Sequence, residues 1–279
     1  MTSSASENTR LTSKVQIRVR AFEDSDSNEI FELYKYAMFH GSASPVNQFL
    51  KHQLRKPFAF VFYALFAIGL GVGIRPPLPP TGGHLAPETA RALVRAAGFI
   101  TSATAAWLFF GWRRQIFRRY KMHFDTAPKG DMAEPGKHYW GINGSVTEGA
   151  KVDNPNGFWV AEIANGKDEG KIVGCVGLDV STNPDPTSAE LRRMVVSPDY
   201  QRLGIGSRLL EHLLAHARAF HDAHPGKLES IWLSTSMYQM QAMKLYERYG
   251  FSEGPKKVIG LKYLFITDKA SLHFFKLKL

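Results

Sequence analysis

Two long apolar runs stand out in the first half of the chain, and segments of mixed polarity surround them. Pro57 to Ile74 contains no charged residue, and Ala96 to Trp112 is a second, slightly shorter uncharged run. A helix that spans the core of a bilayer needs about 20 apolar residues, so the first run is at the lower limit. We therefore predict a membrane hairpin of two hydrophobic helices. The alternative is a buried pair of helices within a soluble domain.

Small and basic residues near these runs favour the membrane interpretation. Gly69 and Gly73 are four residues apart, as are Ser102 and Ala106, so the two helices are expected to approach closely. Three arginines lie between the runs, whereas eight basic residues flank them on the outside: Lys51, Arg55, Lys56, Arg113, Arg114, Arg118, Arg119 and Lys121. The positive-inside rule then places both chain ends in the cytosol.

The remaining pattern predicts an α/β protein with a mixed sheet flanked by helices. Glu23 to Asp26 are acidic or small residues suited to the start of a helix, which we expect to end near Phe39. Thr126 to Asn156 is rich in Gly, Pro and Asp and is expected to be a surface connection, in which His138 to Trp140 are expected to pack rather than to contact substrate. Strands are predicted at Val15 to Arg20, Phe158 to Ile163, Lys171 to Val180, Phe265 to Ile266 and Leu272 to Leu279.

The stretch from Glu190 to Phe220 contains the strongest functional signal. Glu190 to Val196 is predicted as a strand, and a glycine loop from Gln201 to Gly206 follows it. A helix comes next, because apolar residues recur at helical spacing up to Phe220. Free backbone N–H groups and the helix dipole make such a loop suitable for binding a phosphate.

The wider frame of this loop identifies the phosphate. The loop lacks the third glycine of a dinucleotide fingerprint and the Gly-Lys-Ser/Thr of a P-loop. The frame V-x-P-x-x-Q-R-x-G-I-G-S, from Val196 to Ser207, resembles the coenzyme A pyrophosphate motif of the GCN5-related N-acetyltransferase (GNAT) superfamily. The alternative is an ordinary strand, turn and helix in which glycines only permit a tight turn.

A second stretch narrows the resemblance. A predicted strand from Ser230 to Ser234 precedes Ala-x-x-Leu-Tyr-x-x-x-Gly-Phe, which ends at Phe251 and resembles a helix of the same superfamily. Thr-Ser-x-x-Gln-x-x-Ala, from Thr235 to Ala242, is similar to the camello-like membrane-bound N-acetyltransferases. These include cysteine-S-conjugate and endoplasmic-reticulum lysine acetyltransferases. Phe158 to Glu162 and the terminal His273-Phe274 also resemble that group.

The resemblance implies acetyl-CoA as co-substrate and assigns roles to particular residues. Tyr246 would be the general acid, although a packed aromatic residue is the alternative, and Glu190 would be the base unless it is a plain surface residue. The backbone of Val195 and Val196 would pair with the pantetheine and polarise the thioester carbonyl. The other expected coenzyme-binding residues are Gln201, Arg202, Leu203, Gly204, Ile205, Gly206, Ser207 and Gln239.

Composition limits the partners. The net charge is +10 and the pI is about 9.6, which indicates anionic partners. The positive charge lies beside the apolar runs, so we expect lipid rather than nucleic acid. Cys175 is the only cysteine, which excludes an intrachain disulfide and a cysteine-rich zinc site. His212 and His216 are four residues apart on the predicted helix but are expected on a solvated face, so we predict no metal.

These observations predict four segments: a disordered terminus (1–12), a first strand and helix (13–50), a membrane hairpin (51–121) and an acetyltransferase core (122–279). The terminus has no apolar core of a signal peptide. The resemblance implies a membrane enzyme, expected in the endoplasmic reticulum, that acetylates a cysteine conjugate, a small amine or a protein lysine. The competing hypothesis is a membrane scaffold that binds acetyl-CoA without turnover.

Overall fold

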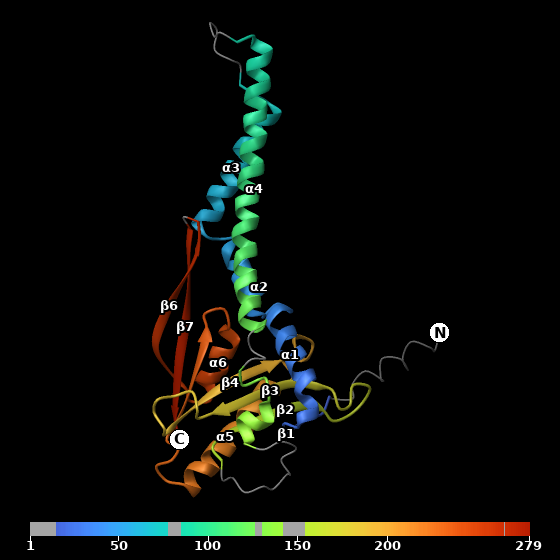
Figure 1. Cartoon of the computed structure of the whole chain (residues 1–279). Helices are drawn as coiled ribbons and strands as arrows, with labels where there is room; N and C mark the ends of the chain where they lie inside the picture. The colour runs from blue at the N-terminus through green and yellow to red at the C-terminus, as the bar shows by residue number, and fades with distance from the viewer. Residues whose placement is uncertain (1–14, 78–84, 126–129, 142–153, 265) are drawn as a thin grey trace, which may run out of the picture. The chain divides into compact units, whose positions relative to one another are not determined.

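The chain forms two compact units in the computed structural model, which describes residues 15–77, 85–125, 130–141, 154–264 and 266–279 (Figure 1). The first unit comprises Met1–Pro45, Phe124–Ile259 and Ser271–Leu279. The second comprises Val46–His123 and Gly260–Ala270. The terminus that was expected to be disordered, residues 1–12, lies outside the described residues.

A seven-stranded mixed sheet in the order β1-β2-β3-β4-β5-β7-β6 confirms the expected fold class. β4 and β5 are parallel, whereas the pairs β1–β2, β2–β3, β3–β4 and β5–β7 are antiparallel. The strands are β1 (Ile17–Ala21), β2 (Gly157–Ile163), β3 (Ile172–Asp179), β4 (Ser188–Val196), β5 (Ser230–Ser236), β6 (Ser252–Tyr263) and β7 (Ile266–Lys278).

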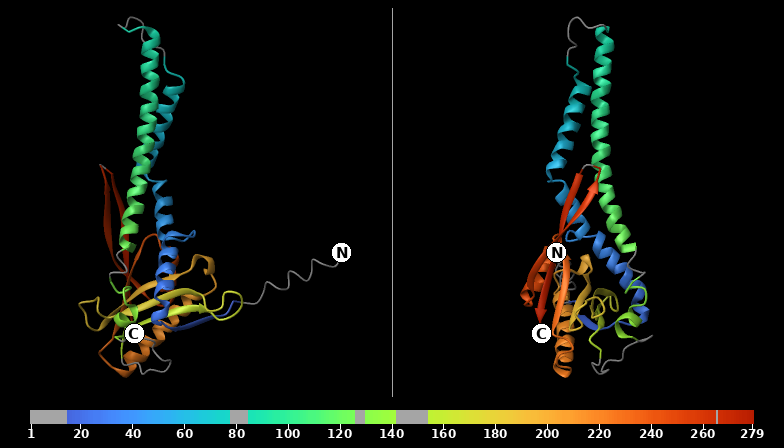
Figure 2. Two further views of the ribbon diagram at one scale, coloured as in Figure 1. Left: turned by 45° about the vertical axis from the view of Figure 1, so that its right-hand side comes forward. Right: turned by 60° about the vertical axis from the view of Figure 1, so that its left-hand side comes forward.

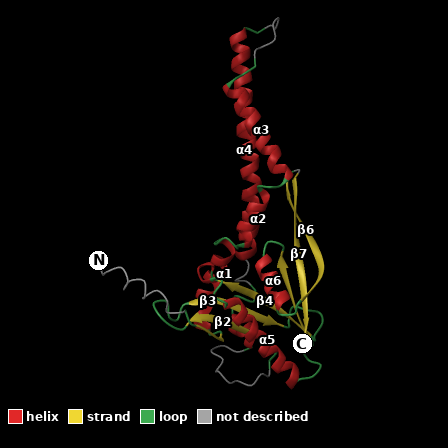
Figure 3. Cartoon of the chain, turned by 180° about the vertical axis from the view of Figure 1, so that it is seen from behind, coloured by secondary structure: helices red, strands yellow, loops and turns green. Residues whose placement is uncertain are grey.

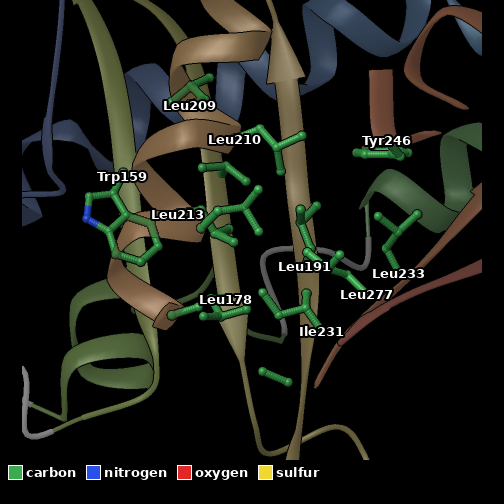
Figure 4. Close-up of a cluster of buried hydrophobic side chains, with 14 of the residues drawn as sticks. Trp159, Leu178, Leu191, Leu209, Leu210, Leu213, Ile231, Leu233, Tyr246 and Leu277 are labelled. Atoms are coloured by element: carbon green, nitrogen blue, oxygen red, sulfur yellow. The ribbon is translucent and has the colours of Figure 1, made fainter. Parts of the chain in front are cut away.

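Helix α5 (Ile205–Ala223) forms the main core with one face of this sheet. Its apolar stripe is buried as the spacing predicts, and Leu209, Leu210 and Leu213 lie beside Leu178 and Leu191 in Figure 4. Trp159 belongs to the same cluster, whereas the neighbouring Phe158 contacts Phe22 and Tyr139 instead. This alternation is the two-residue period of a strand whose two faces are both covered.

The N-terminal helix begins as the acidic residues predict. A short 3₁₀ turn, η2 (Asp24–Asp26), precedes α1 (Ser27–Phe39), and the Glu23 N–H donates to Asp26 Oδ2 at 2.9 Å. Arg20 forms an ion pair with Asp26 at 2.7 Å. The acidic cluster therefore caps a helix and fastens it to β1, so its carboxylates are engaged within the fold.

The connection before β2 is more than a surface loop in its described part. Residues Gly136–Trp140 form a short π-helix, η4, in which Tyr139 is fully buried and its hydroxyl donates to Asp131 Oδ2 at 2.6 Å. The packing expected of Tyr139 is confirmed, whereas the segment around it is a short helix rather than an irregular surface connection. Residues 126–129 and 142–153 of the same connection lie outside the described residues.

The last two strands differ from the expected ones. Ser252–Tyr263 is a strand of 12 residues that the sequence pattern did not predict. Of the expected short strand at Phe265–Ile266, residue 265 lies outside the described residues and Ile266 is the first residue of β7. β7 starts at Ile266 and continues through the expected strand at Leu272. The β6 segment mixes lysines and glycines with few apolar positions, so it has no clear two-residue period.

The second unit contains α2 (Pro45–Gln53), α3 (Pro57–Ile74) and α4 (Pro87–Asp125). α3 coincides with the first apolar run, and α4 extends the second run at both ends because the flanking residues also favour a helix. Both helices are long and apolar enough to cross a membrane. Large apolar side chains lie open on them, including Ile68, Ile100 and Trp107, which are 63%, 65% and 70% exposed.

Glycines bring α3 and α4 together, as the small residues predict. A Cβ on Gly69 would lie 2.7 Å from Gly98 O, and one on Gly98 would lie 2.5 Å from Gly73 N. Ser102 Oγ donates to Phe66 O at 2.8 Å across the same crossing. Gly98 is the contact that the spacing did not indicate, since only Gly69, Gly73, Ser102 and Ala106 were expected to form this interface.

Candidate active site

The candidate site begins where β4 and β5 separate. The two strands pair only at Ser188↔Ser230, Ala189↔Ile231 and Glu190↔Trp232. β4 nevertheless continues to Val196 and stays paired with β3 on its other edge. Beyond Glu190, the β5-facing edge of β4 therefore carries backbone N–H and C=O groups without a ladder partner from β5, which suits pairing with an extended ligand.

A bulge in β4 accompanies this separation. The register moves from Cys175↔Val195 to Gly177↔Arg192, so β4 holds one residue more than β3 across this interval. Arg193 lies in the bulge with φ 54°, in the left-handed region. Bulges bend the strand that carries them, so this extra residue directs Met194, Val195 and Val196 away from β5.

A buried ion pair holds the bulge. The Arg193 guanidinium donates to Asp131 Oδ2 at 2.9 Å and to Tyr34 Oη at 3.1 Å, and it lies over the Tyr34 ring. Burial opposes the ionisation of Asp131, but the hydrogen bond and charge of Arg193 outweigh it and lower the pKa of Asp131 to about 2. The unusual backbone at Arg193 is thus fixed by its own side chain.

The glycine loop follows β4 and η5 (Pro198–Tyr200). Gly204 and Arg202 have φ of 79° and 67°, and these left-handed residues turn the chain sharply into α5. The Arg208 N–H donates to Gly204 O at 3.1 Å as the first bond of the helix. The N–H groups of Ile205, Gly206 and Ser207 precede that bond and have no acceptor within the helix, which leaves them available to an anion.

The other expected coenzyme-binding residues take varied positions around this loop. Val195 and Ile205 are buried, and Leu203 is exposed. A Cβ on Gly206 would lie 3.4 Å from Leu245 and 3.6 Å from Met194, so this glycine faces α6 (Met240–Arg248) and the β4 bulge. The loop, the bulge and α6 therefore meet at one place in the first unit.

Gln239 has a structural position at the end of β5. Its Oε1 accepts hydrogen bonds from Thr235 Oγ1 at 3.1 Å and from the Ser236 N–H at 3.3 Å. The side chain thereby closes the turn between β5 and α6. Its carboxamide oxygen is engaged within the chain, and the Thr-Ser-x-x-Gln pattern has a direct explanation in this turn.

Tyr246 connects α6 to the β4 bulge. Its side chain is buried beside Phe251 and Phe275, at the edge of the cluster in Figure 4. The hydroxyl donates to Met194 Sδ at 3.6 Å, a weak acceptor. Burial raises the pKa of Tyr246 above its ordinary value, so the phenol keeps its proton at neutral pH. A protonated hydroxyl beside the separated strands is what a general acid requires.

Glu190 lies at the last paired position of β4 and β5. Burial raises the pKa of its carboxyl, while a hydrogen bond with Thr182 and the charge of Arg192 oppose that shift. Arg192 Nε lies 3.4 Å from Glu190 Oε2. A carboxyl with a raised pKa accepts a proton more readily near neutral pH than an ordinary glutamate does. Glu190 is therefore not a plain, fully solvated surface residue.

Sequence reasoning missed the charged residues beside Glu190. Arg192 also pairs with Asp179 at 2.9 Å, and His138 Nε2 lies 2.8 Å from the same carboxylate. Asp179 is fully buried, and although burial opposes it, hydrogen bonds from His138, Ser181 and Arg192 lower its pKa. Two adjacent arginines, Arg192 and Arg193, in the middle of an apolar strand were the available signal for this network.

The two histidines of α5 differ from each other. His212 is exposed although its ring lies 5.6 Å from Trp159, whereas His216 is half-buried with its ring 4.9 Å from Trp159 and 6.3 Å from Trp140. Burial lowers the pKa of His216. The expected solvated face is therefore wrong for His216, because the neighbouring tryptophans cover it. Within the described residues, no group of three or more His, Cys, Asp or Glu side chains could hold a metal.

This arrangement agrees with a family comparison. Residues 116–251, which contain β2 to α6 and the glycine loop, match the acetyltransferase (GNAT) family. The matched part of the chain is a GNAT-type acetyltransferase domain. The matched region ends at the Gly-Phe that closes α6 and includes Glu190, the loop and Tyr246. The expected resemblance to the GNAT superfamily is confirmed.

Two curated relatives extend the comparison. The "Probable N-acetyltransferase camello" of Xenopus tropicalis is 35% identical over 102 residues, which cover 37% of this chain and 41% of the relative. The "N-acetylaspartate synthetase" of Danio rerio is 24% identical over 255 residues, which cover 90% of this chain and 73% of the relative. The chain thus matches about two fifths of the camello protein and most of the fish protein.

Solved acetyltransferase structures also align with the chain. An acetyltransferase from Salmonella typhimurium, determined with its cofactor acetyl-CoA, is 13% identical, with a TM-score of 0.44, and covers 94% of this chain and 93% of its own. An N-acetyltransferase from Staphylococcus aureus is also 13% identical with a TM-score of 0.44, and covers 94% of this chain and 98% of its own.

Proposed function

We propose that the protein is a membrane-anchored N-acetyltransferase that moves an acetyl group from acetyl-CoA to an amine. One observation carries this proposal: the glycine loop of α5, the free edge of β4 and the Tyr246 hydroxyl converge where β4 and β5 separate. The GNAT-type acetyltransferase domain and relatives whose names describe N-acetyltransferases support it.

The residues present fit a coenzyme that carries a pyrophosphate. The N–H groups of Ile205, Gly206 and Ser207 lack acceptors within α5, and Arg202 adds an exposed cation beside them. The free edge of β4 at Val195 and Val196 suits the amides of an extended pantetheine arm. Acetyl-CoA supplies the activated thioester when bound. The residues of the chain orient that thioester and carry out the proton transfers.

Two side chains are suited to the proton transfers of this reaction, Glu190 by its raised pKa and Tyr246 by the position of its hydroxyl. Glu190 takes a proton from the acceptor ammonium, directly or through water, because burial raises the pKa of its carboxyl. The free amine then forms the new C–N bond as the C–S bond breaks, and the nitrogen loses a second proton to solvent as it becomes an amide. Tyr246 donates its proton to the departing sulfur, and backbone N–H groups of the β4 edge stabilise the carbonyl oxygen while it carries negative charge.

The acceptor class is an amine, and the proposal includes cysteine conjugates, other small amines and protein lysines. A relative named N-acetylaspartate synthetase adds the amino group of aspartate to the panel. Specificity among these amines is a matter for a substrate screen.

Membrane anchoring is the second part of the proposal. α3 and α4 present large exposed apolar side chains along their length, which a solvated surface rarely does over so wide an area. Basic residues concentrate at the outer flanks of the pair. We place both chain ends in the cytosol and the protein in the endoplasmic reticulum, on the strength of that asymmetry and of the camello resemblance.

An assay on membranes tests the enzymatic part. Membranes that contain the expressed protein should release CoA thiol from acetyl-CoA with at least one amine of the panel. Gly206→Asp should abolish this release, because a carboxylate would enter beside Met194 and Val196 at the anion-binding loop. Gly254→Asp is the control, since this exposed glycine of β6 has no positive φ and a Cβ on it would make only an ordinary contact, 3.6 Å from Phe274 O. Retained acetyl-CoA binding without turnover for every amine would favour a scaffold.

A further inference from the structure

The tip of the β6–β7 hairpin belongs to the same compact unit as α3 and α4. This segment, Gly260–Ala270, is named the hairpin tip here, and its described residues are 260–264 and 266–270. Ile266 is buried in a cluster with Ala59, Phe62 and Trp112. Figures 1 and 3 show the tip beside the end of α3 at which that helix begins. Nothing in the sequence pattern indicated this association.

Polar contacts fasten the hairpin tip at the start of α3. Asp268 is fully buried and forms an ion pair with Lys56, the residue that directly precedes α3. Gln53 Nε2 donates to the same carboxylate at 3.3 Å, and Gln115 Nε2 donates to Lys262 O at 3.1 Å. A buried carboxylate needs a partner to remain ionised, so this contact fixes the level of the tip along the helices.

The hairpin tip contacts α3 and α4 at the end of the helix pair where the basic residues lie. Tyr263 packs against the cluster of Ala59, Phe62, Trp112 and Ile266, as Leu108 and Phe109 of α4 do, at the last apolar turns before Arg113 and Arg114. Tyrosine is enriched at this depth of a bilayer, where its ring is apolar and its hydroxyl remains wet. The hairpin tip therefore lies where the polar headgroups would meet the acyl chains.

Leu264 has an unusual position at the end of the tip. Its side chain is 66% exposed, and its φ is 48°, in the left-handed region that Gly and Asn adopt more easily. No burial of the Leu264 side chain against the described residues offsets this backbone strain. Lys262 and Lys269 are exposed on either side of it. An exposed leucine between two lysines, in a strained turn, is explained if lipid covers the leucine.

We propose that the hairpin tip is an interfacial element that binds anionic phospholipid. Leu264 enters the outer acyl region, and Lys262 and Lys269 contact phosphate headgroups together with the exposed Arg55 and Arg114. This inference rests on the proposed membrane anchoring, because α3 and α4 set the depth of the tip. Figure 2 shows the two long strands that lead to this tip.

Site-directed fluorescence in lipid nanodiscs tests the insertion. The full chain carries an environment-sensitive dye on Leu264→Cys, and Cys175 stays silent because it is fully buried and burial raises its pKa to about 12. Emission should shift to the blue, and lipids with a spin label near the headgroup should quench it. Val258→Cys is the control, since Val258 is 64% exposed on the part of β6 that lies in the other unit.

A third label separates this inference from the anchoring proposal. Ile68→Cys lies midway along α3 with 63% exposure and should be quenched by labels deep in the bilayer. Quenching at position 68 with a water-like signal at position 264 would leave the anchor intact and overturn the inference. A water-like signal at both positions would overturn both proposals.

Lipid charge tests the headgroup contact. Replacing phosphatidylcholine by a mixture with phosphatidylserine should increase quenching at position 264 by about two-fold or more. The double variant Lys262→Gln/Lys269→Gln should lose this increase, whereas Lys256→Gln/Lys257→Gln, on the part of β6 in the other unit, should keep it. Equal quenching in both lipid compositions would overturn the recognition of anionic headgroups.

Discussion

At the scale of single residues, burial changes the proton affinity of both candidate catalytic groups. Tyr246 and Glu190 are the two proposed proton carriers, and burial raises the pKa of both. For the glutamate, the raised pKa strengthens a proton acceptor near neutral pH. A tyrosine is protonated at neutral pH without any shift, and a raised pKa makes its proton harder to release. The position of the hydroxyl beside the separated strands, rather than its pKa, therefore supports Tyr246 as the donor.

Tyr246→Phe should lower kcat toward the lower end of the range of about 10²–10⁴-fold that general acids contribute. The KM for acetyl-CoA should change little, because the hydroxyl matters most when charge develops on sulfur. Thermal stability should hold, since only a weak bond to Met194 Sδ is lost. Steady-state kinetics in detergent measure this, with Tyr36→Phe, an exposed tyrosine of α1, as control. Wild-type kcat would remove Tyr246 from the mechanism.

Glu190→Gln should lower kcat/KM by about 10²-fold or more at neutral pH and remove the acid limb of the pH profile. In the wild type, activity should fall as the pH drops through the raised pKa of Glu190, because the base becomes protonated. The native state also holds this proton more tightly than the unfolded chain, so the contribution of Glu190 to stability declines as the pH rises from 4.5 through that pKa. An unchanged acid limb in the variant would assign the base elsewhere.

At the scale of elements, two sets of contacts position the candidate site and the pair of helices α3 and α4. The bulge of β4 depends on Arg193 and Asp131, and the crossing of α3 and α4 depends on glycines at their contact. Both devices are contacts between segments far apart in sequence. Each can be disturbed without touching the proposed reacting groups.

Asp131→Asn should destabilise the protein by about 3–5 kcal/mol, because it leaves the buried Arg193 guanidinium without its charge partner. Activity per folded molecule should also fall, since the bulge orients the β4 edge. Thermal unfolding and kinetics at low temperature measure the two effects. Asp168→Asn is the matched control, because Asp168 is exposed and its partner is the Tyr200 hydroxyl. Equal stability of both variants would contradict this role.

Gly98→Val should loosen the helix crossing and cost about 1–3 kcal/mol of stability in detergent, because its Cβ would collide with the backbone of Gly73. Gly71→Val is the control on the facing helix, since a Cβ there meets nothing within 4 Å. Thermal aggregation in detergent compares the two variants. If both behave alike, close glycine packing does not hold the pair together.

At the scale of the whole molecule, a single fold requires the segments before and after the hairpin to lie on one side of a membrane. β1 precedes α3 and pairs with β2, which follows α4. Both ends of the helix pair therefore lead into the same sheet. An even number of crossings would satisfy this requirement, and we propose from the basic flanks that this side is the cytosol.

Tags at both termini should be digested by protease added to sealed microsomes, whereas a tag inserted after Pro77 should be protected. The reason is that Arg75, Arg91 and Arg95 are outnumbered by the basic residues of the outer flanks. Alkaline carbonate should leave the protein in the pellet. A protected C-terminal tag, or extraction by carbonate, would contradict the proposed topology.

The sequence alone determined the elements in which apolar residues recur at regular spacing and whose ends are marked by a change in residue type. The apolar run Pro57–Ile74 is α3 with the same bounds, and the stripe ending at Phe220 is buried in α5. These patterns are local: side-chain periodicity and glycine placement act within one element. The glycine loop could be recognised for the same reason, since its free N–H groups follow from its position at a helix start.

Tertiary structure alone decided which distant residues meet. Nothing in the local pattern shows that Arg193 would be buried against Asp131, that Gly98 would meet Gly73, or that Asp268 of β7 would pair with Lys56. The long strand Ser252–Tyr263 was missed because its residues have no two-residue period. The stability of a strand depends on the side chains that pack against it from neighbouring strands and helices. The local sequence does not show which side chains these are.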